Sequence, residues 1–189
     1  MKKFLAIVIL SLSLTTPSQS DDIRDFEIEG FSVGDSLLDY FSKKEIDEYK
    51  SMPSWPNKKY TRFVSFENLN IYDGILFYFK DDGNYLVSSI SAILKFPNNI
   101  NSCYKKKMEV TKDFKDIFTD YETNSYKSDH QQDKTGKSKN DIIDFNFSNG
   151  ASSRVICTDW SKEKGIDDEL RVILSSKEYT YFITNEAYK

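Results

Sequence analysis

Apolar positions in the first half of the chain predict short helical segments at 34–49. Leu37, Leu38 and Phe41 have the spacing of one helix face, in a helix that opens at 34–36. Ser42 and Glu45 form the pattern of a capping box. This box either continues the same helix after a bend or begins a second one that runs to residue 49.

Three strands are expected next, at 60–66, 74–80 and 85–96. Residues 75–79 are a continuous apolar run, and most even positions of the third segment are apolar, which makes one of its faces apolar. Asp82 and Gly83 lie between the last two segments, where Asp-Gly is typical of a hairpin turn.

The second half predicts a helix, three more strands and a final helix. The apolar residues of 100–118 lie on one helical stripe, and strands are expected at 141–147, 152–160 and 169–175. A second capping-box pattern at 175–178 favours a C-terminal helix, although 179–184 could equally be a strand. The polar stretch 119–140 is interpreted as an unusually long loop.

These elements indicate an α+β fold with antiparallel sheets and helices on one face, because hairpins and meanders produce antiparallel pairing. Their order also allows two tandem α-β-β-β units, at 33–97 and 98–176. We expect a single domain spanning 21–189.

Residues 1–20 have the features of a bacterial signal peptide. Lys2 and Lys3 precede an apolar run that ends at Leu14, and Ser18 and Ser20 form a small-x-small cleavage signal. The run is shorter than a bilayer span requires, which favours cleavage over the alternative of an uncleaved N-terminal anchor, and no later stretch is apolar enough to cross a membrane. We therefore expect a periplasmic or secreted protein with no transmembrane segment after cleavage.

Charge and composition exclude several functions. The net charge is −4, and removing 1–20 with its two lysines and no acid would leave 169 residues at −6. Nucleic-acid binding needs a basic face, so it is not expected. One His and two Cys leave little material for a metal site or a His-based catalytic network, and no cofactor is expected.

Two resemblances follow from particular segments. Residues 28–41, with 136–139 and 157–161, resemble a group of uncharacterised exported proteins of marine bacteria, which implies no function. The Val33-Gly34-Asp35-Ser36 opening resembles helix-plus-meander domains such as β-lactamase-inhibitor-like proteins and outer-membrane assembly lipoproteins. That resemblance implies only the fold, since the lipidation Cys of the lipoproteins is absent.

Cys103 and Cys157 are predicted to form a disulfide. Export would place them in an oxidising compartment, and the helix that carries Cys103 should pack on the sheet that carries Cys157. The alternative is two buried free thiols, and the Cys-x-x-Cys spacing of a redox pair is absent.

The best candidate binding residues lie in the polar segment. His130, Lys134, Lys137 and Lys139 could meet an anionic partner, or could simply be solvated. Residues 135–138 contain the Gly-Lys-Ser of a phosphate loop, but the first Gly of that pattern is Gln131 here, so nucleotide binding is not expected.

Acidic clusters at 81–82 and 167–169 could supply carboxylates for hydrolysis, or simply be turn residues. We therefore expect a non-enzymatic binding or accessory protein that contacts a protein, an envelope component or a small ligand. The alternatives are a carboxylate-based hydrolase of envelope or extracellular material and a structural envelope protein.

Overall fold

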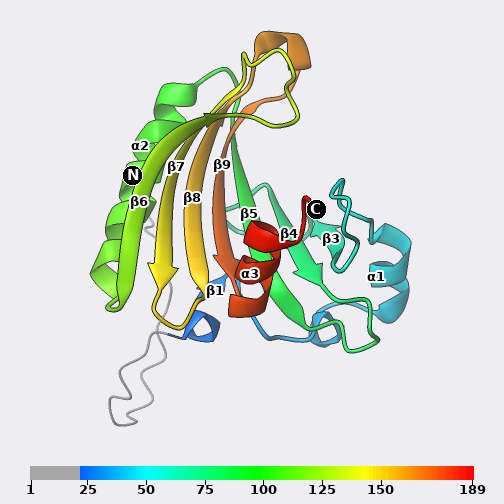
Figure 1. The fold of residues 1–189 in the computed structure, drawn as a ribbon. Coiled ribbons are helices and arrows are strands. Elements are labelled where there is room, and N and C mark those ends of the chain that lie inside the picture. The colour runs from blue at the N-terminus through cyan, green and yellow to red at the C-terminus, as the bar shows by residue number, and fades with distance from the viewer. Residues whose placement is uncertain (1–21) are drawn as a thin grey trace.

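The computed structural model describes residues 22–189, which form a seven-stranded antiparallel sheet with helices on both faces (Figure 1). The strand order is β3-β4-β5-β9-β8-β7-β6, and β1 and β2 form a separate two-stranded ribbon. The α+β class with antiparallel sheets is thus confirmed. The strands are β1 (Glu27–Ile28), β2 (Phe31–Ser32), β3 (Thr61–Ser65), β4 (Gly74–Phe79), β5 (Val87–Phe96), β6 (Tyr121–Asp129), β7 (Lys139–Phe147), β8 (Ser152–Asp159) and β9 (Asp168–Ser175).

Helix α2 (Ile100–Ile117) covers one face of the sheet, which we call the closed face. It packs mainly on β8 and β9, and the predicted disulfide joins Cys103 to Cys157 across this contact with 5.9 Å between the Cα atoms. Lys107 is buried beneath the helix and pairs with Asp141 of β7 at 2.6 Å. These two links fix α2 to the centre and to one side of the sheet.

The closed face carries the main hydrophobic core because alternate strand residues point toward α2. In the three central strands these are aliphatic side chains with almost no exposure, and the N-terminal segment packs aromatic rings against the same layer. The core residues of β5, β9 and β8 include Ile90, Ala92, Leu170, Val172, Leu174 and Val155.

Helix α3 (Lys177–Asn185) lies on the opposite face, which we call the open face (Figure 1). The C-terminal helix is confirmed, although its N-cap is Ser176, whose side chain accepts from the amide of Tyr179. The prediction that all helices lie on one face of the sheet is wrong for α3. This helix packs on the opposite face because its Tyr179 and Phe182 contact Tyr60 and Trp55 in a second aromatic cluster.

The prediction of a long loop at 119–140 is wrong. Residues Tyr121–Asp129 form edge strand β6, which pairs with β7 over nine residues, and only the connection from 130 to 138 is irregular. Most side chains of β6 are exposed on both faces of the sheet, so its sequence shows no apolar alternation. The second half therefore has four strands, and it joins the first half through the β5–β9 pair.

The helix expected at 34–41 is reduced to a 3₁₀ turn at Leu37–Asp39, capped by Ser36. The capping box of Ser42 and Glu45 is present as expected and begins α1 (Lys43–Tyr49). Over 22–189, no helix has the length and apolar character needed to cross a membrane. The predicted signal peptide lies outside the described residues.

Candidate functional site

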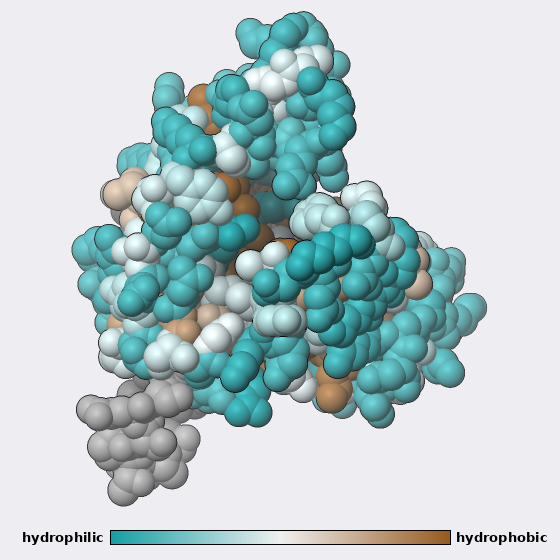
Figure 2. All heavy atoms as spheres, in the orientation of Figure 1, coloured by the Kyte–Doolittle hydropathy of each residue, from teal (hydrophilic) through white to brown (hydrophobic). Residues whose placement is uncertain are grey.

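The open face holds a groove between the sheet and α3, with a cavity volume of about 230 Å³. Figure 2 shows a hollow in the middle of this face with apolar surface at its bottom. The groove is lined by Trp55, Tyr78, Ser89, Ser91, Asp144, Asn146, Ser152, Arg154, Arg171, Ile173, Ser175, Tyr179, Thr180, Ile183, Thr184 and Tyr188.

Strand alternation produces the floor of the groove. Arg154 and Ile173 lie directly opposite each other on β8 and β9, and Ser91 of β5 lies opposite Ile173 on the other side. Because residues at facing positions point to the same side of a sheet, these side chains form one row across the open face. Leu76 and Asp144 extend the row at its two ends.

Beside α3 the floor of the groove consists of serines, whose small side chains leave space above the sheet. Ser89 and Ser175 share a hydrogen bond of 2.9 Å, whereas the buried Oγ of Ser91 has no hydrogen-bond partner in the part of the chain that the structure describes. A buried hydroxyl without a partner costs free energy, so Ser91 is a natural contact for a bound polar group.

Two arginines supply the charge on the open face. Arg154 forms a two-pronged ion pair with Asp144, whose Oδ2 accepts from Nη2 at 2.9 Å. Burial alone would lower the pKa of Arg154, but the bonds to Asp144 outweigh burial and raise it, so the guanidinium stays charged. Arg171 pairs with Glu169 on its own strand at 2.7 Å.

The aromatic wall comes from α3 and the segment before β3. Trp55 stacks on Tyr78 with 5.5 Å between the ring centroids, and Tyr179 lies 5.3 Å from the same tyrosine. Burial raises the pKa of Tyr179 well above its ordinary value, so its hydroxyl stays neutral. The hydroxyls of Ser152 and Thr180 lie 2.9 Å apart and fix α3 to β8.

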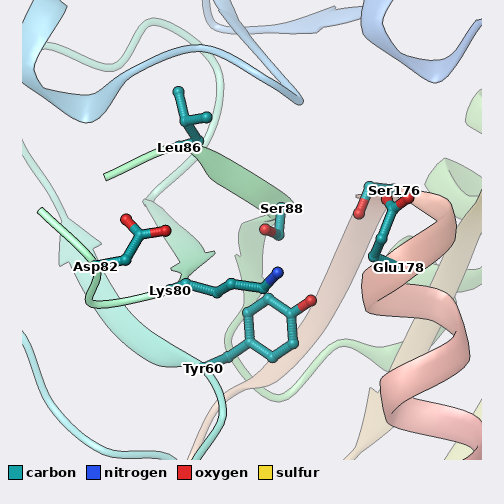
Figure 3. Close-up of a pocket in the computed structure, with 7 residues that line it drawn as sticks. All are labelled: Tyr60, Lys80, Asp82, Leu86, Ser88, Ser176 and Glu178. Atoms are coloured by element: carbon teal, nitrogen blue, oxygen red, sulfur yellow. The ribbon is translucent and has the colours of Figure 1, made fainter. Parts of the chain in front are cut away.

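A second, smaller cavity of about 200 Å³ lies at the N-terminus of α3, and we call it the α3 pocket (Figure 3). Its residues come from the strand ends beside α3 and from the first turn of the helix. They are Tyr60, Lys80, Asp82, Leu86, Ser88, Ser176 and Glu178.

The candidate residues of the polar segment lie around an ordered loop at 130–138. The carboxylate of Asp133 is the centre of this loop. Its Oδ1 accepts from the amide and hydroxyl of Thr135, and its Oδ2 accepts from the amide and hydroxyl of Ser138. These bonds hold the pKa of Asp133 well below its ordinary value. Within the Gly-Lys-Ser run, Ser138 therefore binds a carboxylate of its own chain.

The three lysines and His130 do not converge on one point. Lys137 pairs with Glu163 and Lys139 with Asp129, while Lys134 is exposed. The ring of His130 packs on Trp160 with 4.1 Å between centroids, and burial lowers its pKa. Their role in binding stays a prediction.

The acidic clusters are also dispersed. Asp81 pairs with Lys50 at 2.8 Å, and Asp168 accepts from the amide of Trp160 at 3.0 Å. Burial raises the pKa of Asp168, which faces the same side as Leu170 and so lies on the closed face. No group of three or more metal-ligating side chains occurs within 22–189.

No family model, curated protein or solved structure matches this chain. The two resemblances stated from the sequence thus stay untested, and function has to be argued from the groove and the α3 pocket.

The polar and charged residues of the groove were not among the sequence candidates. Ser91, Arg154 and Arg171 each interrupt the apolar pattern of a central strand, and that was the one available signal. An Arg in the middle of an otherwise apolar strand is expected on a face that meets solvent or a ligand. Trp55 and Tyr188 could not be found this way, because they reach the groove from distant parts of the chain.

Proposed function

We propose that this chain is an exported, non-enzymatic binding protein that holds its ligand or partner in the groove on the open face. The main support is the composition of the groove, where stacked aromatic rings, two charged arginines and the unpaired hydroxyl of Ser91 surround one hollow. Trp, Tyr and Arg are the side chains that contribute most to binding energy at protein interfaces.

The hydrolase alternative has less support. Glycoside hydrolysis needs two carboxyl groups placed on either side of the scissile bond, one of them free to donate a proton. On the open face, Asp144 and Glu169 each use their oxygens to bind an arginine. Asp168, the carboxyl with a raised pKa, belongs to the opposite face.

The disulfide supports export, because such bonds persist in oxidising compartments. Export also implies cleavage after Ser20, and intact-mass measurement of the exported chain tests this. A mass corresponding to 21–189 is expected, and a chain that keeps 1–20 would contradict cleavage.

Two matched isoleucines test the groove. Ile183 of α3 lines it, whereas Ile117 is an exposed residue at the end of α2 on the closed face. We expect Ile183→Glu to abolish capture of a ligand or partner by the tagged protein from the exported fraction, and Ile117→Glu to leave capture unchanged.

Melting temperatures of both variants serve as the control for folding. Equal capture by folded Ile183→Glu and wild type would contradict binding in the groove, and so would equal loss in the two glutamate variants.

A further inference from the structure

The hydroxyl of Tyr60 identifies the α3 pocket as a site of its own. The side chain is fully buried, and no hydrogen bond of good geometry reaches its oxygen within residues 22–189; the hydroxyl of Ser88 is a weak donor that lowers the pKa of Tyr60 slightly. In Figure 3 the hydroxyl points into the space between the end of Lys80 and the first residues of α3. Burial is the main cause that raises the pKa of Tyr60, so the hydroxyl remains a donor at neutral pH.

Other donors surround the same space. The amino group of Lys80 lies over the Tyr60 ring, 6.0 Å from the ring centroid, and the side chains of Lys80 and Ser88 extend toward the same part of the pocket in Figure 3. Ser176 is the N-cap of α3, a nine-residue helix whose first amides and dipole favour a negative group at this end. Together they suit the two oxygens of a carboxylate.

Acidic side chains line the pocket as well. Glu178 lies in the first turn of α3, and Asp82 lies across the pocket on the turn after β4. These carboxylates would repel a purely anionic ligand, but Glu178, at the same end of the pocket as the N-terminus of α3, would attract an ammonium group close to the carboxylate of the ligand. The pocket therefore presents donors and acceptors to one small molecule.

We propose that the α3 pocket binds a free α-amino acid. The carboxylate of the ligand accepts from Tyr60, Lys80 and the N-terminus of α3, and its ammonium group donates to Glu178. A volume of about 200 Å³ suits a compact ligand, since sites for larger organic ligands start near ~300 Å³. This site lies apart from the groove and does not depend on the function proposed for it.

The test uses the chain with its disulfide intact and the standard L-amino acids, each added singly at millimolar concentration. Acetate and methylammonium serve as half-ligands. Amide shifts in NMR report binding, and we expect at least one amino acid to shift the amides of 176–179 and to bind more tightly than either half-ligand. Tyr60→Phe and Glu178→Gln should each weaken that amino acid about tenfold, the value of one lost hydrogen bond to a charged group.

Lys105→Met is the matched control, because Lys105 is exposed on α2 on the other face of the sheet. It should leave affinity unchanged. Without ligand, Tyr60→Phe should keep or raise the melting temperature, since it removes a buried hydroxyl that makes no hydrogen bond of good geometry.

Three results would overturn the proposal. One is the absence of shifts with every amino acid. Another is equal binding of acetate and the best amino acid, with no loss in Glu178→Gln, which would indicate a simple anion site. The third is unchanged affinity in Tyr60→Phe.

Discussion

Asp133 organises the loop at 130–138 through its two carboxylate oxygens. One oxygen serves Thr135 and the other serves Ser138, so four donors depend on one side chain. Such a centre is hard to predict, because a single Asp among Lys, Ser and Thr has the composition of a solvated loop. For the same reason the lysines around it were candidates in the sequence, although two of them form ion pairs in the structure.

Asp133→Asn should remove the hydrogen bonds that one of the two carboxylate oxygens accepts in this loop. An amide side chain keeps one acceptor oxygen and presents an NH₂ group in place of the other, so it can serve either Thr135 or Ser138 but not both. We expect hydrogen exchange at one of these two amides to rise roughly tenfold, as for one lost charged hydrogen bond. Unchanged exchange at both amides would contradict this role.

The pH dependence of Asp133 has a definite sign. Its pKa is lower in the folded chain than in the unfolded one, so its stabilisation is present at neutral pH and is lost as the pH falls below about 4. The melting temperature of the wild type should therefore exceed that of Asp133→Asn at pH 7, and the gap should close in acid. A gap that widens in acid would show that the carboxylate does not act in this way.

Elements with an apolar face were predictable, and elements without one were not. Helix α2 and strands β4, β5 and β8 were located within about two residues, because each buries one face. Strand β6 was missed because it is an edge strand whose side chains mostly meet solvent. The helix predicted at 34–41 was too long, because apolar spacing over a single turn does not determine where a helix ends. The structure has only a 3₁₀ turn at Leu37–Asp39.

The disulfide between α2 and β8 should contribute strongly to the free energy of unfolding. Cys103 and Cys157 are 54 residues apart, and closing a loop of this size is worth about 4 kcal/mol in the chain-entropy model. Urea unfolding of the Cys103→Ala/Cys157→Ala variant should show a free energy of unfolding lower by roughly that amount. A midpoint equal to that of the wild type would mean that packing and the Lys107–Asp141 pair alone hold α2 in place.

At the scale of the whole molecule, the pairing of β5 with β9 determines the site. This pair joins strands from the two halves of the chain, and it brings Ser91 of one half beside Ile173 of the other. This pairing cannot be inferred from the sequence of either half, because the paired residues of β5 and β9 lie about 80 positions apart in the chain. The sequence could therefore predict most of the strands and the disulfide but not the groove.

The open face remains accessible because α3 covers only part of it, beside the row that holds Ser89 and Ser152 (Figure 1). The rest of this face lines the groove with Arg154, Arg171 and Ile173, and Figure 2 shows the hollow there. Binding of a ligand or partner in the groove would then bury surface that folding alone leaves open.

Two tyrosines near the C-terminus allow the most direct measurement. Tyr188 lines the groove and is 57% exposed, whereas Tyr181 is 59% exposed and does not line it. Each is replaced in turn by the photoreactive p-benzoylphenylalanine, and the exported chain is irradiated in its native compartment. Binding in the groove predicts a covalent adduct from position 188 and none from 181. Adducts of equal yield from both positions, or none from 188, would contradict it.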